Sequence, residues 1–561
     1  MNMVILLVIL IVYSHISIIT TTTTTTDTND DDNGLLVATT SGIVKGHPIP
    51  DIGVNEYLGI PYAEPPIGEL RFARPVPLRR PEKDIIEVKD KSEGVWCYQN
   101  VNKHIKAFEW FKEDEDCLHL NVWAPERAYL QNGRPYSKLK PVVIILFPGG
   151  FSYGSAYIEQ SNGSILATYG IVAVSLNYRI GPLGMYMLDD DSGPGNVGFY
   201  DQNLAFKWVQ QNIRSFGGDP NMVTIYGVSA GSFSVSTHIV SPLSRGLFKR
   251  AIMSSGALIW NKNKPVLSKK AAMNLTRKLA INNNCPLDKP IAPCLRAVNN
   301  TYNLLVRSST FVVIDFTVPN EKTEFCPQLF NKALKYFNYN RDIELMAGST
   351  RDEGPAISAV TFPDIILPDM SIEKFGQLLE RMNDQHHDFD IDKIIKHYTS
   401  DIDTFNHTVN RRRFTDIYGD VLMRCPTYTF AKHLAMNGER VYYYDFNYFT
   451  KSNPQYEFLV KSGLVLNGSQ HGLDADFHIG VPLRYPDNYS EVDKNFTQYV
   501  MEIWTNFIKF GYPGDDWPVM LDPRKSNEPT IVKDINLKDR SHLLVNPYAD
   551  SCEGIWKDYF W

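Results

Sequence analysis

A serine between two glycines is the feature of this sequence that could most directly do chemistry. Ser229 lies in the stretch 227–231 (Gly-Val-Ser-Ala-Gly), which follows the apolar run 222–226. Glycines on both sides of a serine allow a sharp turn from strand to helix, because a Cβ at either position would clash. Such a turn exposes the hydroxyl at the top of a sheet. The same pattern also occurs at ordinary turns, so a nucleophile is predicted only if its partners are found elsewhere.

A serine nucleophile needs a base, a group that orients the base, and donors for the oxyanion. The hydroxyl is a poor nucleophile at neutral pH until a base takes its proton. The N–H of the residue after the serine, Ala230, supplies one oxyanion donor, and a glycine-rich loop supplies others. Gly149 and Gly150 follow the apolar run 142–147 and predict such a loop, the alternative being an ordinary glycine turn. We therefore expect an oxyanion hole at Gly149, Gly150 and Ala230.

Thirteen histidines compete for the role of base. In α/β hydrolases the order along the chain is serine, acid and then histidine, which favours the late His471 in a Gly-Ser-Gln-His-Gly stretch. His238 falls in the helix expected after the serine and is predicted to be structural. His386 and His387 resemble a solvated pair or a weak metal pair.

Two neighbouring carboxylates compete for the role of the orienting acid. Asp352 and Glu353 follow the short apolar run 345–347. A carboxylate just beyond a strand end can reach across the top of a sheet. Both residues meet this condition, and the residues alone do not choose between them. Either one could instead be a surface charge.

The segments around these residues alternate between strand and helix. Continuous apolar runs are typical of parallel strands that are buried on both faces, and stripes at helical spacing are typical of the helices between them. Such segments follow one another at 141–147, 170–176, 202–213, 223–226 and 500–508. Their alternation predicts an α/β fold with a mostly parallel central sheet flanked by helices, the α/β-hydrolase arrangement.

The length and the two ends of the chain set its organisation. No linker or internal repeat divides residues 34–561, so we expect a single domain there. The apolar run 4–13 is shorter than the ~20 residues of a membrane-spanning helix. Residues 1–19 are therefore predicted to be a signal peptide, with a buried N-terminal strand as the alternative. Residues 20–33 are rich in Thr and Asp and predict a low-complexity leader.

Charge and polar motifs indicate a secreted protein. The net charge is −7 without a basic patch, which argues against nucleic acid as a partner. No second long apolar stretch or lipid-anchor tail follows, so we expect no stable membrane anchor. No metal or cofactor is expected, and the oligomeric state is left open. Seven Asn-x-Ser/Thr sequons are glycosylation candidates: Asn162, Asn274, Asn299, Asn406, Asn467, Asn488 and Asn495.

Cysteine content fits the same compartment. Six of the seven cysteines could pair under oxidising conditions, but counting does not give the connectivity. The seven are Cys97, Cys117, Cys285, Cys294, Cys326, Cys425 and Cys552.

Several longer motifs carry a family resemblance. They lie at 58–66, 115–123, 177–179, 195–202 and 216–220. With the stretch around Ser229, they make residues 34–561 resemble the type-B carboxylesterases and cholinesterases, an α/β-hydrolase group.

The resemblance implies roles that spacing left open. It identifies Ser229 as the nucleophile, Glu353 rather than Asp352 as the acid, and His471 as the base. It implies the oxyanion donors named above. It also implies the disulfides Cys97–Cys117, Cys285–Cys294 and, as in the cholinesterase branch, Cys425–Cys552, which leaves Cys326 unpaired.

The activity implied is hydrolysis of small carboxylic esters through an acyl-enzyme intermediate. A cholinesterase is the first alternative, but Val228 replaces the glutamate that commonly precedes the serine, and Pro355 and Ala356 stand where cholinesterases carry aromatic residues. Pro148 also departs from the usual His-Gly-Gly-Gly of the oxyanion loop. A noncatalytic adhesion or binding protein is the second alternative, against which the complete triad argues.

Overall fold

The computed structural model describes residues 35–99, 111–126, 138–259, 261–263, 268–305, 324–325, 330–452, 468–525 and 528–561. Four features predicted from the sequence therefore lie outside the described residues. These are the signal peptide 1–19, the leader 20–33, Cys326 and the sequon at Asn467.

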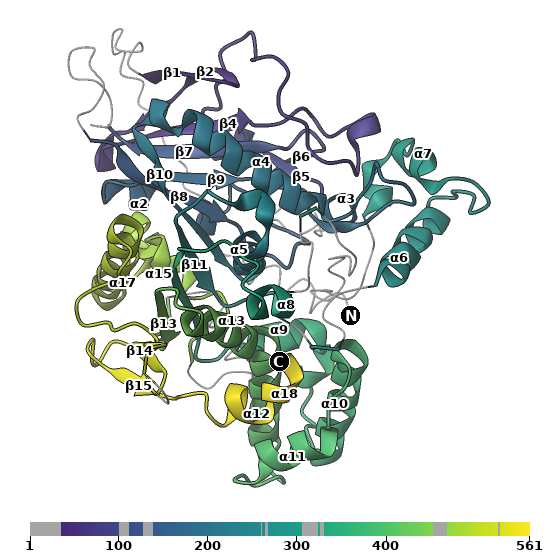
Figure 1. Cartoon of the computed structure of the whole chain (residues 1–561), viewed down its shortest axis with the longest axis vertical. Coiled ribbons are helices and arrows are strands. Elements are labelled where there is room, and N and C mark those ends of the chain that lie inside the picture. Colours follow the sequence, from purple (N-terminus) through teal and green to yellow (C-terminus); the bar gives the residue numbers. More distant parts are fainter. Residues whose placement is uncertain are drawn as a thin grey trace.

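An eleven-stranded sheet lies at the centre of the described chain (Figure 1). Strands β8 to β14 form the parallel centre of this sheet, whereas the outer strands on both sides pair antiparallel. From edge to edge, the order is β15 (Leu543–Val545), β14 (Ile531–Ile535), β13 (Val441–Phe446), β12 (Glu344–Thr350), β11 (Arg250–Ser254), β10 (Gly218–Val228), β8 (Lys140–Leu146), β9 (Val172–Leu176), β7 (His119–Pro125), β4 (Val54–Pro61) and β3 (His47–Ile49). Two small sheets pair β1 (Leu36–Thr39) with β2 (Gly42–Lys45) and β5 (Val95–Cys97) with β6 (Lys112–Asp114).

The central strands arise from the continuous apolar runs of the sequence. Every residue of β9 is buried, and so are the last five residues of β8. A strand that is covered on both faces has apolar residues at successive positions instead of alternating apolar and polar ones. These apolar runs could therefore be predicted as strands from the sequence. Strand β10 is longer than the expected run 223–226 because it begins at Gly218, beyond an irregularity in its pairing with β8.

Helices cover both faces of the sheet (Figure 1). Side chains alternate between the faces, so that Ile144 packs into one apolar cluster and Ile145 into the other. The helices are α2 (Ser164–Thr168), α3 (Gly181–Met185), α4 (Val197–Asn212), α5 (Ala230–Val240), α6 (Lys269–Asn282), α7 (Ile291–Arg296), α8 (Phe330–Lys335), α9 (Gly354–Thr361), α10 (Ile372–His386), α11 (Ile391–Thr399), α12 (His407–Gly419), α13 (Cys425–Met436), α15 (Ala475–His478), α16 (Val481–Arg484), α17 (Glu491–Phe510) and α18 (Lys557–Phe560). The cluster of Ile144 includes residues of α4, α5, α10, α12 and α13, and that of Ile145 includes residues of α2, α15 and α17.

Helix α17 shows how local sequence sets an element's ends. Ser490 and Asp493 form a reciprocal capping box at its start. Gly511 follows its last residue with a φ of 80°, a left-handed conformation that favours glycine. The predicted stripe 500–508 and its stop at Gly511 are confirmed, while the start lies earlier because polar residues fill the first turns.

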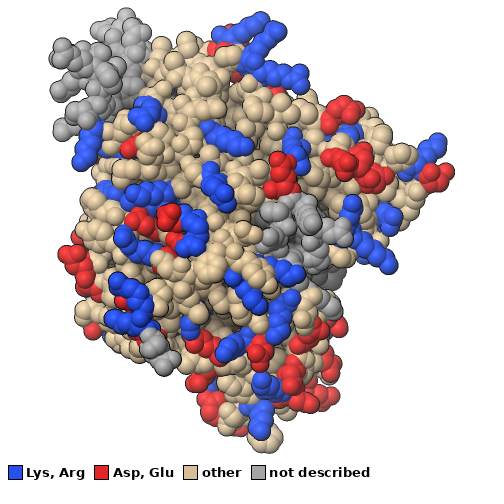
Figure 2. All heavy atoms as spheres, viewed as in Figure 1, with Lys and Arg blue, Asp and Glu red and all other residues tan. Residues whose placement is uncertain are grey.

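The surface carries both signs of charge. On the face shown in Figure 2, Lys and Arg side chains are interspersed with Asp and Glu over most of the molecule. This mixture fits the small negative net charge and does not form one continuous basic surface on that face. Within the described residues, we find no helix with the length and apolar character that crossing a membrane requires.

Three disulfides link described cysteines. They join Cys97 to Cys117, Cys285 to Cys294 and Cys425 to Cys552. These are the pairs that the resemblance implied. The third closes a span of 127 residues and ties the start of α13 to the C-terminal segment.

The sequons that the structure describes differ in exposure. Asn274, Asn299, Asn406, Asn488 and Asn495 are exposed, as a glycan requires. Asn162 is half-buried, and its side-chain oxygen accepts a hydrogen bond from the N–H of Ser164 at 2.9 Å.

Candidate active site

The candidate residues lie at the carboxyl-terminal end of the central strands. Strands β8, β10, β11 and β12 are neighbours and run parallel, so their carboxyl ends lie side by side. The glycine loop follows β8, Ser229 follows β10, and Glu353 follows β12. Ligands of open α/β sheets bind outside the carboxyl ends of the strands, so the topology itself places these groups in a suitable position.

Ser229 occupies a strained turn between β10 and α5. Its φ of 54° and ψ of −121° are rare for a residue with a side chain. Its N–H donates to the carbonyl of Ser254 at 2.9 Å, which fixes the turn to the neighbouring strand. A Cβ on Gly227 would lie well under 3.0 Å from the backbone of Gly231, and a Cβ on Gly231 would collide with the carbonyl of Leu146. Both glycines of the motif are therefore required by close backbone approach, as the sequence predicted.

The glycine loop lies against this turn. Gly149 and Gly150 have φ values of 119° and 59°, and a Cβ on Gly149 would collide with the carbonyl of Tyr153. Within the described residues, the N–H groups of Gly149, Gly150 and Ala230 donate no hydrogen bond to another group. The close approach of Gly231 to the carbonyl of Leu146 packs the start of α5 against the end of β8, the strand that leads into the glycine loop.

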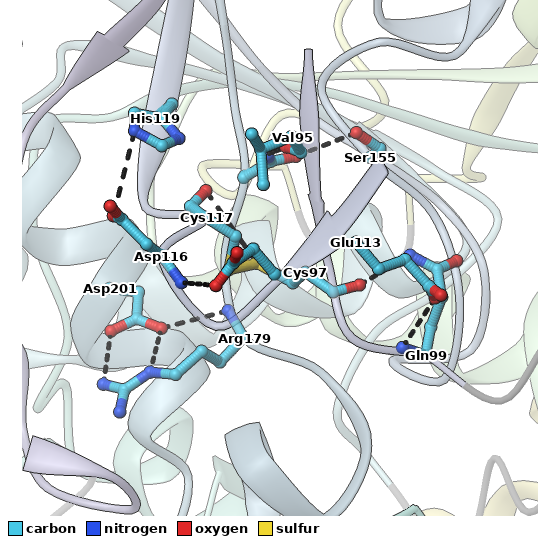
Figure 3. The surroundings of a disulfide bond; sticks show 12 residues. Val95, Cys97, Gln99, Glu113, Asp116, Cys117, His119, Ser155, Arg179 and Asp201 are labelled. Carbon is cyan, nitrogen blue, oxygen red and sulfur yellow. Dashed lines mark hydrogen bonds and ion pairs between the residues drawn. A yellow bond between two sulfur atoms is a disulfide. The ribbon is translucent and has the colours of Figure 1, made fainter. Parts of the chain in front are cut away.

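Gln99 holds the far side of the loop. Figure 3 shows this residue close to the disulfide of Cys97 and Cys117. The side chain of Gln99 accepts from the N–H of Gly154 at 3.0 Å and donates to the carbonyl of the same residue at 3.1 Å. It also donates to the carbonyl of Cys97 at 2.9 Å, and Cys97 is bonded to Cys117. The loop with Pro148 is therefore anchored to a covalently fixed segment.

Glu353 contacts His471 directly. Its Oε2 lies 2.6 Å from Nδ1 of His471. Its Oε1 accepts from the hydroxyl of Ser255 at 2.5 Å and from the N–H of Thr350 at 2.7 Å. The carboxylate is 1% exposed, so these donors replace the water that it loses.

The surroundings keep Glu353 ionised. Burial alone would raise its pKa, but the charge and hydrogen bond of His471, with the donors Ser255 and Thr350, lower the pKa below its ordinary value. An ionised carboxylate only accepts hydrogen bonds, so Nδ1 of His471 must carry the proton. This tautomer leaves Nε2 unprotonated, which is the form that a general base needs.

The side chains of Ser229 and His471 are both partly exposed to solvent. Among the described residues, no hydrogen bond joins the hydroxyl of Ser229 to the ring of His471. Catalytic contacts of this kind are often long in an unliganded enzyme and shorten with substrate.

Asp352 faces away from His471. Its Oδ2 accepts from Nε and Nη2 of Arg351 at 3.0 and 2.9 Å, and its Oδ1 pairs with Arg412 of α12. Its N–H donates to the carbonyl of Ser469 at 2.8 Å, which ties its turn to the loop of His471. Of the two carboxylates between which spacing could not choose, the structure pairs Glu353 with the histidine.

The other candidate histidines lie apart from this network. The two ring nitrogens of His238, a residue of α5, are hydrogen-bonded to the side chains of Ser244 and Gln202. Burial lowers the pKa of His238 to about 3. The expectation that His386 and His387 form a solvated pair is wrong for His386. Burial among aromatic side chains lowers the pKa of His386 to about 3.

Two polar residues near the site were not predicted. Ser255 follows β11 with a φ of 60° and binds Glu353, and its only sequence signal is its place just beyond a strand end. Asp474, three residues after His471, is fully buried and accepts from the hydroxyl of Ser254 at 2.5 Å. Burial raises the pKa of Asp474 to about 7.

Comparison with known proteins identifies the chain's relatives. Residues 33–549 match the carboxylesterase family. The chain belongs to this family. Acetylcholinesterase of Bungarus fasciatus is 33% identical over 85% of this chain and 79% of its own length. Cholinesterase of Mus musculus is 30% identical over 94% and 87%, and acetylcholinesterase of Danio rerio is 32% identical over 87% and 82%. The family resemblance predicted from the motifs is confirmed.

In this member of the carboxylesterase family, Val228 occupies the position just before the serine. Its side chain is 3% exposed and packs into the apolar cluster that also contains Phe477. The site therefore has no carboxylate at this position.

Proposed function

We propose that the chain is a serine esterase that hydrolyses small carboxylic esters. Nε2 of His471 takes the proton of the Ser229 hydroxyl as the oxygen attacks the ester carbonyl. The N–H groups of Gly149, Gly150 and Ala230 hold the negative oxygen of the tetrahedral intermediate. The proton then passes from His471 to the departing alcohol, and an acyl-serine remains. Water activated by His471 releases the acid and restores the serine.

The single observation that carries this proposal is the direction of the hydrogen bonds around Glu353. A buried, ionised carboxylate fixes the proton on Nδ1 of His471 and stabilises the imidazolium that forms during attack. His238, by contrast, contacts the neutral side chains of Ser244 and Gln202. The strained turn of Ser229 and the unoccupied N–H groups at its side supply the remaining parts of a serine hydrolase.

A cholinesterase is the second candidate, and the names of the relatives favour it. A quaternary ammonium is bound by aromatic faces and is helped by a nearby anion. Here Val228 supplies no anion, and the start of α9 presents Pro355 and Ala356. These two features favour an uncharged ester as the substrate.

Labelling and turnover test the proposal together. A fluorophosphonate probe is expected to label the protein at Ser229, as located by peptide mass spectrometry, and not to label Ser229→Ala. Acetylthiocholine is compared with its neutral carbon isostere, 3,3-dimethylbutyl thioacetate. A higher kcat/KM for the neutral ester supports a general carboxylesterase, and a higher value for the cation supports a cholinesterase.

A protein without turnover would require another function. Absence of both labelling and hydrolysis over a panel of acyl chain lengths, in a folded protein, would contradict the proposal. Saturable binding to a protein partner would then favour the adhesion alternative.

We further infer secretion, a single domain and glycosylation. The three disulfides favour an oxidising compartment. One sheet contains strands from β3 near the start to β15 near the end, which supports one domain over residues 34–561. The exposed sequons support glycans at those positions, and glycosidase treatment with a shift in mass tests this.

A further inference from the structure

The helix behind the acid contains an irregular turn. Helix α12 continues into a π turn at Asp420–Arg424, labelled η12, and then into α13. Turns of this kind are rare and are frequently found at functional sites. Here the turn begins directly after Gly419, and a Cβ on Gly419 would meet the N–H of Gly354 and the Cβ of Glu353. Figure 1 shows α12 and α9 packed together in this region.

The π turn directs Arg424 toward the strand end that leads to Glu353. Nη2 of Arg424 donates to the carbonyl of Arg351, two residues before the acid. Nη1 of Arg424 pairs with Asp420 one turn earlier. A single guanidinium therefore joins the turn of the helix to the turn of the acid.

The guanidinium is itself held in place. Oδ2 of Asp420 accepts from the hydroxyl of Tyr398 at 2.7 Å, and that hydroxyl accepts from Nε1 of Trp556 at 2.7 Å. Cys425 follows Arg424 directly and is bonded to Cys552. Hydrogen bonds fix one end of the π turn and a disulfide fixes the other.

The position of Arg424 also has an electrostatic consequence. Its side chain is 14% exposed, so water screens its charge weakly. Burial would lower its pKa, but the acidic groups Asp420, Tyr548, Asp445 and Glu353 around it raise the pKa further above its ordinary value. Arg424 is thus a largely buried cation with several acidic groups around it, Glu353 among them.

We propose that Arg424 is a positioning residue for Glu353, which fixes the turn of the acid through the Arg351 carbonyl and places a largely buried positive charge at that turn. The inference rests on the proposed function, since it concerns the acid of that triad. The two contributions are separable. A lysine keeps the charge but loses the planar fork that reaches two acceptors, whereas a glutamine loses the charge.

The expected direction of the pH effect follows from the groups around the site. Several elements contribute ionisable groups around Glu353 and Arg424. These groups include His471, Asp474, Asp445, Arg351, Asp420, Asp416, Tyr443 and Tyr548. Removing a cation raises the pKa of Glu353 and of His471 alike. Protonation of either group stops catalysis, so the acid limb of the rate profile must move to higher pH.

The test compares Arg424→Lys, Arg424→Gln and, as a control, Arg411→Gln. Arg411 is a buried arginine of α12, the helix that leads into the π turn, and it donates to the carbonyls of Ile365 and Leu367. For Arg424→Gln, we expect kcat to fall about 10- to 100-fold at unchanged KM. The acid limb should also rise by roughly one pH unit. Arg424→Lys should lower kcat while its acid limb stays in place, and Arg411→Gln should change neither.

A readout without turnover separates this inference from the proposed function. The low-field proton resonance of the Glu353–His471 hydrogen bond is followed by NMR in the folded proteins. It should shift or disappear in Arg424→Gln and persist in Arg411→Gln, whether or not any ester is hydrolysed. An inactive wild-type protein with this pattern would contradict the esterase and leave the positioning role intact. An unchanged resonance or an unmoved acid limb in folded Arg424→Gln would overturn the positioning role.

Discussion

Replacing Glu353 by glutamine tests the candidate triad at its most constrained point. The carboxylate now accepts three hydrogen bonds, from His471, Ser255 and the N–H of Thr350. An amide offers one oxygen and one donor group in the same volume. Its oxygen is expected to face Ser255 and Thr350, because the opposite orientation would place an N–H₂ group against two donors. Each buried donor left unpaired costs about 1–3 kcal/mol.

This orientation sets the size of the effect. The amide N–H₂ would face Nδ1 of His471 and make that nitrogen an acceptor, so the proton would move to Nε2. A histidine with its proton on Nε2 cannot accept the proton of Ser229. A wrong tautomer of this kind lowers kcat by about 10⁴ in a serine protease. We expect a loss of about 10³–10⁴ here, or roughly 4–5.5 kcal/mol of transition-state stabilisation.

The assay needs a matched control and a count of active sites. Asp352→Asn alters the neighbouring carboxylate, which is equally buried but binds Arg351 and Arg412. Both guanidiniums are partly exposed, so this change should cost about 1–3 kcal/mol of stability while most of kcat per site remains. Both variants are measured with an uncharged ester, with sites titrated by fluorophosphonate and folding checked by thermal unfolding. A folded Glu353→Gln that keeps its kcat, beside an inactive Asp352→Asn, would refute the assignment.

Three further changes have defined outcomes. Gly231→Ala places a Cβ against the carbonyl of Leu146 and should displace the Ala230 N–H, which lowers kcat about 10²-fold. The control is Gly376→Ala, because the space around Gly376 is open, and equal kcat values for the two variants would contradict the steric argument. Cys552→Ser should lower the unfolding free energy by roughly 2–5 kcal/mol, measured without reductant, because it opens a span of 127 residues. Val228→Glu should raise the pKa of His471, move the acid limb of the pH–rate profile to higher pH, and increase the preference for acetylthiocholine over its neutral isostere; superimposable limbs would remove this idea.

The sequence predicts best those features that depend on neighbouring residues or on two-sided burial. Strands β8 and β9 were predictable because burial on both faces excludes polar residues from them. The turn of Ser229 was predictable because close backbone approach requires glycine at two fixed positions. The start of β10 was missed because its first residues are polar and pair only beyond an irregularity.

The choice between Asp352 and Glu353 could not be made from spacing. Both residues follow β12 within a few positions, and the direction of each side chain depends on distant partners. Arg412, in a helix 60 residues further along the chain, binds the carboxylate of Asp352. His471, in a loop 118 residues further along, binds the carboxylate of Glu353. Ser255 was missed for the same reason, because only the sheet order brings the end of β11 beside the end of β12.

The buried acids of this region show how one carboxylate becomes suited to orient the base. Burial raises the pKa of Asp445 to about 6 and that of Asp474 to about 7, since their few donors and cations do not offset the loss of water. Glu353 is equally buried, yet its pKa is lowered, because two donors and the His471 ring surround it. Environments that separate the pKa values of neighbouring acids also separate their roles. Glu353 is the acid that contacts the ring of His471, at 2.6 Å from Nδ1, so its charge acts on that ring at the shortest distance.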